Sequence, residues 1–452
     1  MGLNSCGGAE RGAFIMERTA TREKEYDVIV AGGGVAGVAA AVSARRQGKS
    51  VLLIEKTIGL GGLATGGLIN LFVPLCNGRG VQIIKGMAEE LLRLSVKYGY
   101  DTIPKAWKEG EPGENEKTRY ITKFSAPIFT MALTEFVTRE GVELLFDTLI
   151  TEPVMEGRRC LGLIVENKTG CQFYGAKMVV DATGDGDVLF RAGVPMVQGQ
   201  NFHTYFTKGV NLETCKKALD SGDMAQLYGG LYFGGRASLY GDHQPEGKPT
   251  RGGTTVKDVT EYVIENHIEC LNRMKKEEKK SRTVVALPNM PQFRTTRHID
   301  GDYALRAEDA YRHFEDSVAA ICDFDRRDYL YEVPYRTLIR TGFPNLIAAG
   351  RCAAAEGYAW DVLRVIPPAI LTGQAAGVAC CLAIDEAAGK FGRLANDVPE
   401  GSSTCDAADL CSLNVTRLQE QLAAQNVMIH FDDSLVPKEE QKDCHAGAEG
   451  HF

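Results

Sequence analysis

Hydrophobic and polar positions follow a regular order from Tyr26 onward, and that order predicts a strand, a helix and a second strand. The apolar run YDVIVAGG predicts a buried strand that ends in a glycine turn. The small-residue run VAGVAAAVSARRQG predicts a helix that Gly48 closes, and SVLLIEK predicts a second strand that ends at Glu55 and Lys56. We therefore expect one complete βαβ unit, with parallel strands in its sheet.

The next segments leave this unit and return to it. The glycine-rich run GLGGLATGGLINL is followed by a helix near 81–98 and by a polar loop near 109–117, which is expected to belong to an excursion. The helix PIFTMALTEFVTREG and the strand VELLFD then predict a return to the parallel sheet. The stretch TLITEPVMEGRRCLGLIVENKTGCQFYGAKMVVDAT has short alternating runs separated by turn residues, which predicts a β-meander that leads into a core strand.

The remaining segments complete an expected α/β architecture. In the charged helix around 261–280, the run KKEEKK is expected to be a solvated face. A strand, NLIAAG, precedes the small-residue helix AILTGQAAGVACCLAI, and VTRLQEQLAAQ predicts a last amphipathic helix. The expected fold is a Rossmann-like dinucleotide-binding domain with a parallel sheet and β-meander, plus an inserted mixed α+β substrate domain. Its expected divisions are a disordered leader (1–25), three parts of the dinucleotide-binding domain (26–65, 126–190, 341–390), an excursion or cap (66–125), a substrate domain (191–340) and a C-terminal linker and helix (391–452).

The composition narrows the class of protein. The chain has 452 residues, of which 44% are hydrophobic and 24% charged, and this balance is typical of a globular protein. A net charge of -8 with interspersed charges argues against a nucleic-acid partner. No stretch of about 18 uninterrupted apolar residues occurs, so membrane insertion is not expected. The N-terminal stretch lacks the apolar segment of a signal peptide, and 13 cysteines without a C-x-x-C pair indicate reduced thiols in a cytoplasmic protein. Met1 and Met16 are both candidates for the first residue of the translated protein.

A glycine pattern lies between the first strand and the helix. Gly32, Gly34 and Gly37 occupy G-x-G-x-x-G, which permits a tight turn, close approach of a pyrophosphate and close helix packing. Glu55 ends the second strand, where its carboxylate can accept both ribose hydroxyls of a dinucleotide. The two features together predict a dinucleotide site, with a purely structural turn as the alternative, and they do not distinguish FAD from NAD.

Four further segments resemble the FAD-dependent oxidoreductase family of the glutathione-reductase-like flavoprotein class. They are GLGGLATGG, VVDATGDGD, NLIAAGR and LTGQAAG, and the resemblance extends from Tyr26 to about Gln425. It implies FAD, with the ATGD turn around the pyrophosphate–ribityl side and the late helix returning to the isoalloxazine. No motif requires a covalent flavin link. The expected cofactor contacts are Gly32, Gly34, Val35, Ala36, Gly37, Glu55, Lys56, Gly61, Gly62, Ala64, Thr65, Asp181, Gly184, Gly350, Arg351, Thr372, Gly373, Gln374, Ala375 and Ala376.

The late helix has a physical reason to approach the flavin. Pro367 and Pro368 can start it, because the N–H groups that proline lacks are unpaired in a first helical turn anyway. Backbone amides near 372–376 are then expected to face the flavin N1/O2 edge and to stabilise the negative charge of reduced flavin. The alternative is that small residues here serve close helix packing, and both can hold.

The expected substrate residues also rest on resemblance. FRTTRHIDGDYAL resembles the Arg-x-x-Arg segment of the family, with Arg294 and Arg297 as its arginines. An arginine near the flavin can anchor a carboxylate, and a tyrosine or an acid can deliver a proton. The alternative for each residue is an interdomain salt bridge or hydrogen bond. The histidines show no metal-ligand spacing, so no metal site is expected. The expected catalytic residues are Arg364, with Arg297 as helper, Tyr358 as proton donor, and Glu356 and Asp361.

Three functions remain open at this point. The first is an enzyme that exchanges a hydride between flavin N5 and a small, anionic organic substrate. The second is a flavoprotein electron-transfer subunit that works with a separate iron–sulfur partner, as in heterodisulfide reductases; this sequence itself lacks the four-cysteine run of a cluster. The third is a flavin sensor. A closed pocket lined by arginines would favour the first, and an exposed apolar patch at the flavin edge would favour the second.

Overall fold

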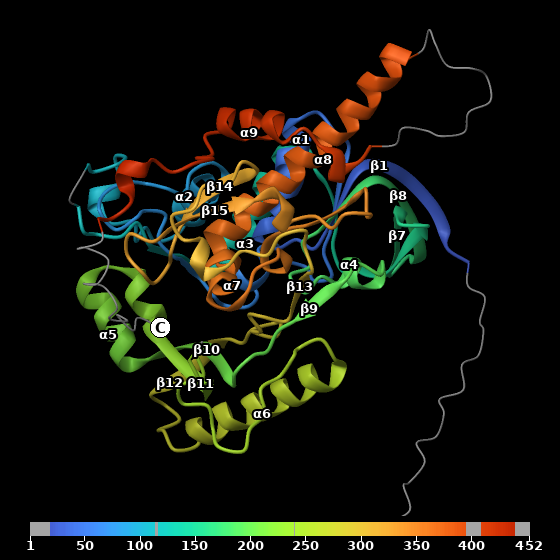
Figure 1. The fold of residues 1–452 in the computed structure, drawn as a ribbon. Coiled ribbons are helices and arrows are strands. Elements are labelled where there is room, and N and C mark those ends of the chain that lie inside the picture. The colour runs from blue at the N-terminus through green and yellow to red at the C-terminus, as the bar shows by residue number, and fades with distance from the viewer. Residues whose placement is uncertain (1–18, 114–115, 239, 395–407, 439–452) are drawn as a thin grey trace, which may run out of the picture.

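A computed structural model describes residues 19–113, 116–238, 240–394 and 408–438 of the chain. Within these residues a seven-stranded sheet runs through the larger part of the molecule, with strand order β5-β2-β1-β8-β7-β6 and β16 paired to β8 (Figure 1). The expected α/β class is confirmed. The strands are β1 (Thr21–Ala31), β2 (Val51–Ile54), β5 (Glu143–Leu145), β6 (Leu149–Glu156), β7 (Arg159–Asn167), β8 (Gly170–Asp181) and β16 (Leu346–Ala348).

Strand direction divides this sheet into two parts. β5, β2, β1, β8 and β16 pair in parallel, whereas β7 and β6 continue from β8 as an antiparallel meander. In β1, Val28 and Val30 pack in one hydrophobic cluster with the long helices, and Ile29 and Ala31 pack in a second cluster on the other face. A strand covered on both faces needs a continuous apolar run, which explains the sequence VIVA.

Two helices cross closely beside the parallel strands. Helix α1 (Val35–Arg46) lies against α8 (Ile366–Leu394), and a Cβ at Gly373 would come within 2.1 Å of the Ala36 carbonyl oxygen. A Cβ at Gly377 would likewise meet the Ala40 carbonyl oxygen at 2.3 Å, so the small residues of α8 serve this packing. Within the described residues, the segment Ile366–Gly389 alone is long and apolar enough to cross a membrane. All of its apolar window is buried in the fold, as in a core helix, so it does not indicate a membrane.

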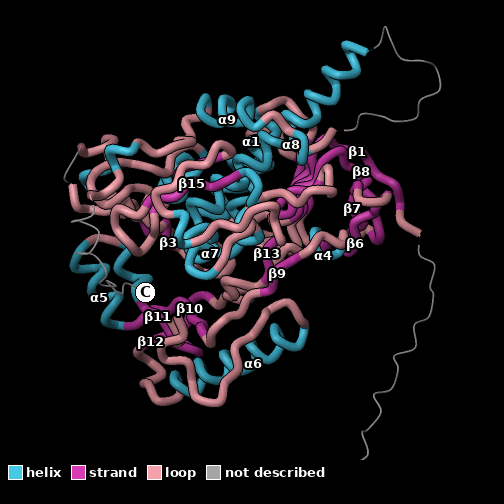
Figure 2. Tube along the Cα trace, viewed as in Figure 1, coloured by secondary structure: helices cyan, strands magenta, loops and turns pink. Residues whose placement is uncertain are grey.

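A smaller lobe lies beside the main body. Its three-stranded sheet, in the order β11-β10-β12, packs with α6 across its outer side (Figure 2). The hairpin of β14 and β15 does not belong to this lobe, because its residues Val318 and Tyr331 pack in the main hydrophobic cluster. The separate lobe is therefore narrower than the expected 191–340. The bounds are β10 (Thr204–Asn211), α5 (Leu212–Ser221), β11 (Gly230–Arg236), α6 (Val256–Met274), β12 (Arg282–Ala286), β14 (Ser317–Cys322) and β15 (Leu330–Pro334).

Several element bounds differ from the sequence-based expectation. β1 begins at Thr21, which pairs with Gln172 of β8, so residues 21–25 belong to the sheet and not to a leader; residues 1–18 lie outside the described part. Helix α6 ends at Met274, and the following KKEEKK run is exposed, as expected. The other elements are β3 (Leu71–Phe72), α2 (Met87–Lys97), β4 (Thr122–Lys123), α3 (Ala126–Arg139), α4 (Asp187–Arg191), β9 (Met196–Gln198), β13 (Arg297–Ile299), α7 (Gly357–Arg364) and α9 (Val415–Ala424).

Candidate functional site

A cavity of about 570 Å³ opens at the carboxyl ends of β1 and β2. Its walls come from the glycine turn after β1, the end of β2, residues 59–66, the turn at 182–184, the loop at 289–294 and the start of α8. A crevice beyond the carboxyl ends of parallel strands is where open α/β sheets bind ligands, and this volume is typical of a cofactor pocket.

The glycine turn fits a phosphate group. Gly32 has a φ of +97°, and a Cβ at Gly37 would lie 1.9 Å from the Gly32 carbonyl oxygen, so both positions require glycine. A Cβ at Gly34 would meet no atom within 4 Å, and Gly34 lines the cavity. Val35 and Ala36, which begin α1, line it as well. Backbone and helix N-terminus are thus open to an anion at this turn.

Glu55 forms the neighbouring wall at the end of β2. Its Oε2 accepts a hydrogen bond from the Gly33 amide at 2.7 Å, and its Oε1 accepts one from the Thr57 amide at 2.8 Å. The side chain is buried and lines the cavity beside the exposed Lys56. Each carboxylate oxygen accepts more than one hydrogen bond, so the two backbone contacts orient Glu55 and leave capacity for ribose hydroxyls.

Residues 61–65 form a further part of the cavity wall, next to the glycine turn. The Gly61 amide donates to the Gly33 carbonyl oxygen at 2.8 Å, and a Cβ at Gly62 would lie 3.1 Å from the Gly34 Cα. Thr65 Oγ1 donates to the Leu60 carbonyl oxygen at 2.6 Å, which fixes the turn. The sequence-predicted contacts Gly61, Gly62, Ala64 and Thr65 all line the cavity.

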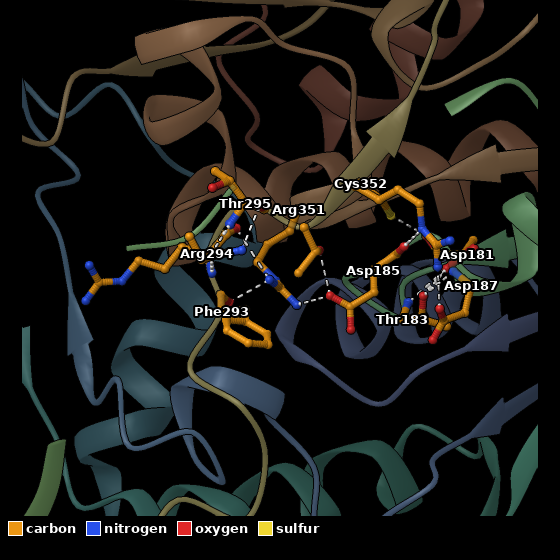
Figure 3. A network of polar contacts seen from close by, with 12 residues as sticks. Asp181, Thr183, Asp185, Asp187, Phe293, Arg294, Thr295, Arg351 and Cys352 are labelled. Carbon is orange, nitrogen blue, oxygen red and sulfur yellow. Dashed lines mark hydrogen bonds and ion pairs between the residues drawn. The ribbon is translucent and has the colours of Figure 1, made fainter. Parts of the chain in front are cut away.

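A polar network around Asp181 holds the ATGD turn (Figure 3). The buried Asp181 carboxylate accepts hydrogen bonds from the Thr183 amide and hydroxyl and from the Val188 and Leu189 amides, at 2.7–3.0 Å. Burial nevertheless raises the pKa of Asp181. Asp181 does not line the cavity, so it shapes the turn that places Gly184 there.

Arg351 joins this turn to the loop opposite. Its Nη2 donates to Asp185 Oδ1 at 3.0 Å, and its Nη1 donates to the Phe293 carbonyl oxygen at 2.7 Å (Figure 3). Arg351 and Gly350 both line the cavity. Two hydrogen bonds from Arg351 Nη1, to the Phe293 carbonyl oxygen and, at 3.4 Å, to the Arg294 carbonyl oxygen, thus fix the backbone around residue 293.

The late helix meets the cavity elsewhere than expected. The cavity touches Val365, Ile366 and Ala369, whereas the predicted contacts 372–376 lie deeper in the helix. Thr372 Oγ1 accepts from the Gly350 amide at 2.9 Å, and Gln374 Oε1 accepts from the Met87 amide at 3.0 Å. The expectation for these amides fails because only the first turn of a helix has free N–H groups. Predicted contacts outside the cavity lining are Gly37, Asp181, Thr372, Gly373, Gln374, Ala375 and Ala376.

Of the five predicted catalytic residues, only Arg364 lines the cavity. Its Nε donates to Asp361 Oδ1 at 2.8 Å, and Nη2 contacts the same oxygen, so the two residues form an ion pair within α7. Burial lowers the pKa of Arg364, and the Asp361 carboxylate opposes that shift.

The other predicted catalytic side chains point elsewhere. Tyr358 Oη donates to Asp323 Oδ1 at 2.7 Å, and burial together with that carboxylate raises the pKa of Tyr358, which makes the phenol a weaker acid. Glu356 is 57% exposed and pairs with Arg306 at 3.4 Å. The sequence placed both near the flavin because they precede α8, but α7 directs them to other faces.

Arg297, the expected helper, does not line the cavity and is bonded to the ATGD turn. Its Nη2 donates to Asp187 Oδ1 at 2.7 Å, and its Nε donates to the Asp185 carbonyl oxygen at 2.8 Å. Its guanidinium also lies 4.2 Å from the centre of the Phe190 ring. Arg297 therefore braces the ATGD turn, and the expectation that it helps to hold substrate is not met by its position.

Arg294, the first arginine of the same motif, reaches the cavity instead. Among the described residues its guanidinium makes no hydrogen bond, ion pair or cation–π contact, and Figure 3 shows it extending away from the network around Arg351. Burial and the positive charge of Arg364 lower the pKa of Arg294 to about 10, so it remains charged at neutral pH. Asn289 lines the cavity too, and its backbone N–H donates to the Gly66 carbonyl oxygen at 3.0 Å.

Comparisons with known proteins agree with this geometry. A family model described as FAD dependent oxidoreductase matches residues 27–225 and 253–390. The chain is 39% identical over 77 residues to an NADH:acrylate oxidoreductase of Vibrio harveyi, and this match covers 17% of this chain and 8% of that protein. The chain is also 32% identical over 79 residues to a thioredoxin reductase of Ureaplasma parvum serovar 3, and this match covers 18% of this chain and 26% of that protein. The matches thus span a small part of either relative.

Two of the solved structures that match this chain have low TM-scores. A geranylgeranyl bacteriochlorophyll reductase-like protein from Thermoplasma acidophilum has a TM-score of 0.39 at 14% identity, covering 92% of this chain and 95% of that chain. An L-proline dehydrogenase from P. horikoshii has a TM-score of 0.37 at 14% identity, and the match covers 78% of this chain and 92% of that chain.

Proposed function

This chain belongs to the FAD dependent oxidoreductase family and is an FAD-binding enzyme, and from that premise we propose that it exchanges a hydride with a small, anionic organic substrate. The observation that carries the proposal is the Arg294 guanidinium, which faces the cavity without a partner among the described residues. Bound FAD supplies the two-electron acceptor or donor.

The residues that line the cavity indicate which of its ends suits each part of the cofactor. The open backbone at Gly34 and the start of α1 suit the pyrophosphate, and Glu55 suits the ribose hydroxyls. The turn at Gly184 and the first turn of α8 border the rest of the cavity, next to Arg294 and Arg364. We propose that the flavin ring lies at that end.

An unpaired arginine in such a cavity favours an anionic ligand. A buried charge without a partner is costly, and the planar guanidinium donates paired hydrogen bonds to a carboxylate or phosphate. The charge of Arg364 is already balanced by Asp361, so Arg294 carries the excess positive charge. We therefore assign the anchoring of substrate chiefly to Arg294, with Arg364 contributing the cavity wall beside it.

Arg351 acts as a positioning residue in this scheme. Its hydrogen bonds to the Phe293 and Arg294 carbonyl oxygens fix the backbone from which the Arg294 side chain departs. Asp185 is in turn fixed by Thr296 Oγ1, which donates to Asp185 Oδ1 at 2.7 Å. A preorganised backbone lowers the entropy lost when the arginine binds its anion.

The electron-transfer alternative required an exposed apolar patch at the flavin edge. The exposed apolar side chains that line the cavity are Ile58, Met131 and Leu149. They surround the end of β2, where Glu55 lies, and not the loop that carries Arg294. This location favours an enclosed substrate site at the arginine end over a docking surface for a redox protein.

The test is anaerobic mixing of the FAD-loaded enzyme with matched carboxylates and their neutral amides, while the visible flavin band is followed. We expect flavin reduction, or reoxidation of the reduced enzyme, with carboxylates only. Arg294→Ala should slow that half-reaction by at least about thirtyfold, since losing one buried charge-assisted contact costs roughly 2 kcal/mol or more.

The control is Arg306→Ala, an exposed arginine outside the cavity. It should react like the wild type. Equal rates with carboxylates and amides, or an Arg294→Ala enzyme that reacts at the wild-type rate, would refute the assignment. Reduction that occurs only with an iron–sulfur protein would instead support the electron-transfer alternative.

A further inference from the structure

Two imidazoles converge on one buried carboxylate far from the cofactor cavity. His313 Nδ1 lies 2.6 Å from Glu332 Oε1, and His430 Nδ1 lies 2.9 Å from Glu332 Oε2. Ligand atoms of all three side chains lie within 4.8 Å of one another. Glu332, on β15, is fully buried, whereas the two imidazoles are 41% and 46% exposed. None of the three residues lines the cavity.

The charge of Glu332 lacks a permanent counterpart. No lysine or arginine among the described residues pairs with it, and its remaining contact is the Phe314 amide, which donates to Oε2 at 2.8 Å. A buried carboxylate without a compensating positive charge is strongly unfavourable. Among the described residues, the two imidazoles are the groups placed beside Glu332 that could hold a compensating cation.

The second nitrogen of His313 bears on the nature of that cation. His313 Nε2 lies 3.0 Å from Asp433 Oδ1, a contact that is attractive only when Nε2 carries the proton. In the neutral ring, Nδ1 then presents a bare lone pair to the Glu332 oxygen, and two lone pairs repel. A carboxylate on the outer nitrogen, with the inner nitrogen directed at the ligand cluster, is the arrangement that orients histidines at metal ions.

We propose that His313, His430 and Glu332 form a binding site for a divalent transition-metal ion, with Zn²⁺ as the best match. Two imidazole nitrogens and one carboxylate oxygen are a ligand set that zinc accepts, and the exposed side of the cluster leaves a position for water. Zinc bonds of roughly 2.0–2.1 Å need ligand atoms about 3.3 Å apart. The contacts at 2.6 and 2.9 Å therefore lengthen by about 0.4–0.7 Å on binding.

The ion would fasten the C-terminal segment to the core. His430 precedes Phe431, which is buried in the main hydrophobic cluster, while Glu332 belongs to the β14–β15 hairpin. These ligands are 98 residues apart in the chain, so their shared ion closes a long loop. The site is structural and its metal has no part in the redox chemistry of the cavity.

The test uses tag-free, FAD-loaded protein treated with a chelator and then titrated with Zn²⁺. We expect one Zn²⁺ per chain by elemental analysis after dialysis, and a rise in the melting temperature. His430→Ala should weaken zinc binding at least about tenfold, and Asp433→Ala should weaken it less. His243→Ala, an exposed histidine outside the cluster, should bind zinc like the wild type.

Two results would overturn the proposal. One is a wild type that retains no stoichiometric zinc and shows no zinc-dependent change in melting temperature, which would leave protons as the partners of Glu332. The other is a His430→Ala protein that binds zinc as tightly as the wild type. If His430→Ala does not fold, His313→Gln provides the same comparison, because that side chain is also partly exposed.

Discussion

Arg364 and Asp361 form an ion pair one helical turn apart on α7, with Arg364 Nε donating to Asp361 Oδ1 at 2.8 Å. The two side chains are only 8% and 16% exposed. This pair neutralises one of the arginines at the cavity, whereas the Arg294 guanidinium has no partner among the described residues. It also makes Arg364 important for stability, whatever its contact with substrate.

Our first prediction follows from that pair. Arg364→Ala should lower the free energy of unfolding by roughly 3 kcal/mol, because removal of one partner leaves the Asp361 charge buried and unpaired. Urea denaturation of the FAD-loaded protein measures the change. The double variant Asp361→Asn/Arg364→Met should recover most of the loss, and an Arg364→Ala protein of wild-type stability would contradict the argument.

A second prediction concerns cofactor retention at Glu55. Glu55→Arg should weaken FAD binding by at least about tenfold, because the charged acceptor of the ribose hydroxyls is lost and a hydrogen bond to a charged group contributes about 1.5–3 kcal/mol. The fluorescence of released FAD on dilution measures it. Glu109→Arg, in an exposed loop, should retain FAD normally. Equal retention by the two variants would exclude the proposed role of Glu55.

The third prediction separates two glycines of one motif. Gly34→Ala places a methyl group in open space beside the cavity, so it should weaken FAD binding with little effect on the melting temperature of the apoprotein. Gly37→Ala should instead destabilise the fold by roughly 1–3 kcal/mol or more, since its Cβ would lie 1.9 Å from the Gly32 oxygen. Calorimetry of the two apoproteins, with FAD titration, distinguishes these effects; identical behaviour would count against the turn geometry.

A fourth prediction concerns pH. Burial lowers the pKa of the His298 imidazole below its usual 6.5, and the Asp300 and Glu356 carboxylates only partly oppose this. The unfolded chain therefore binds the proton more readily, so the His298 contribution to stability is complete above pH 6.5 and declines as the pH falls below that value.

The measurement is the free energy of unfolding between pH 5 and pH 7.5. The difference in proton binding at His298 between the folded and unfolded states contributes a slope of at most about 1.4 kcal/mol per pH unit. His298→Asn should reduce the slope in this interval. His243→Asn, at an exposed position, should leave it unchanged. A slope that is the same in all three proteins would show that His298 does not titrate as proposed.

Much of the cofactor end could be predicted from the sequence. Gly32, Gly34 and Gly37 act within one turn, and Glu55 follows directly from the end of β2, so neighbouring residues already contain the information. The continuous apolar run of β1 and the alternating runs of β6 to β8 indicated their burial and pairing correctly. The start of β1 was missed because the residues before Tyr26 are polar, and their pairing with β8 depends on the partner strand.

The substrate end was decided by the tertiary structure. Arg294 and Arg297 stand three residues apart in one motif, and only the path of the loop before β13 determines that Arg294 enters the cavity while Arg297 meets Asp187. Likewise, the depth at which α8 meets the cavity depends on its packing against α1, which Gly373 and Gly377 permit but which also requires the position of α1.

The histidine cluster shows most clearly that sequence spacing does not reveal which residues from distant elements converge. His313, Glu332 and His430 have no spacing that signals a metal site, because they come from a loop, a strand and the C-terminal segment. The sequence by itself determined the strands, the glycine turn and the carboxylate at the end of β2, since backbone conformation and side-chain periodicity depend on residues close in the chain. Only the tertiary structure decided which distant charges converge, because that depends on how whole elements pack.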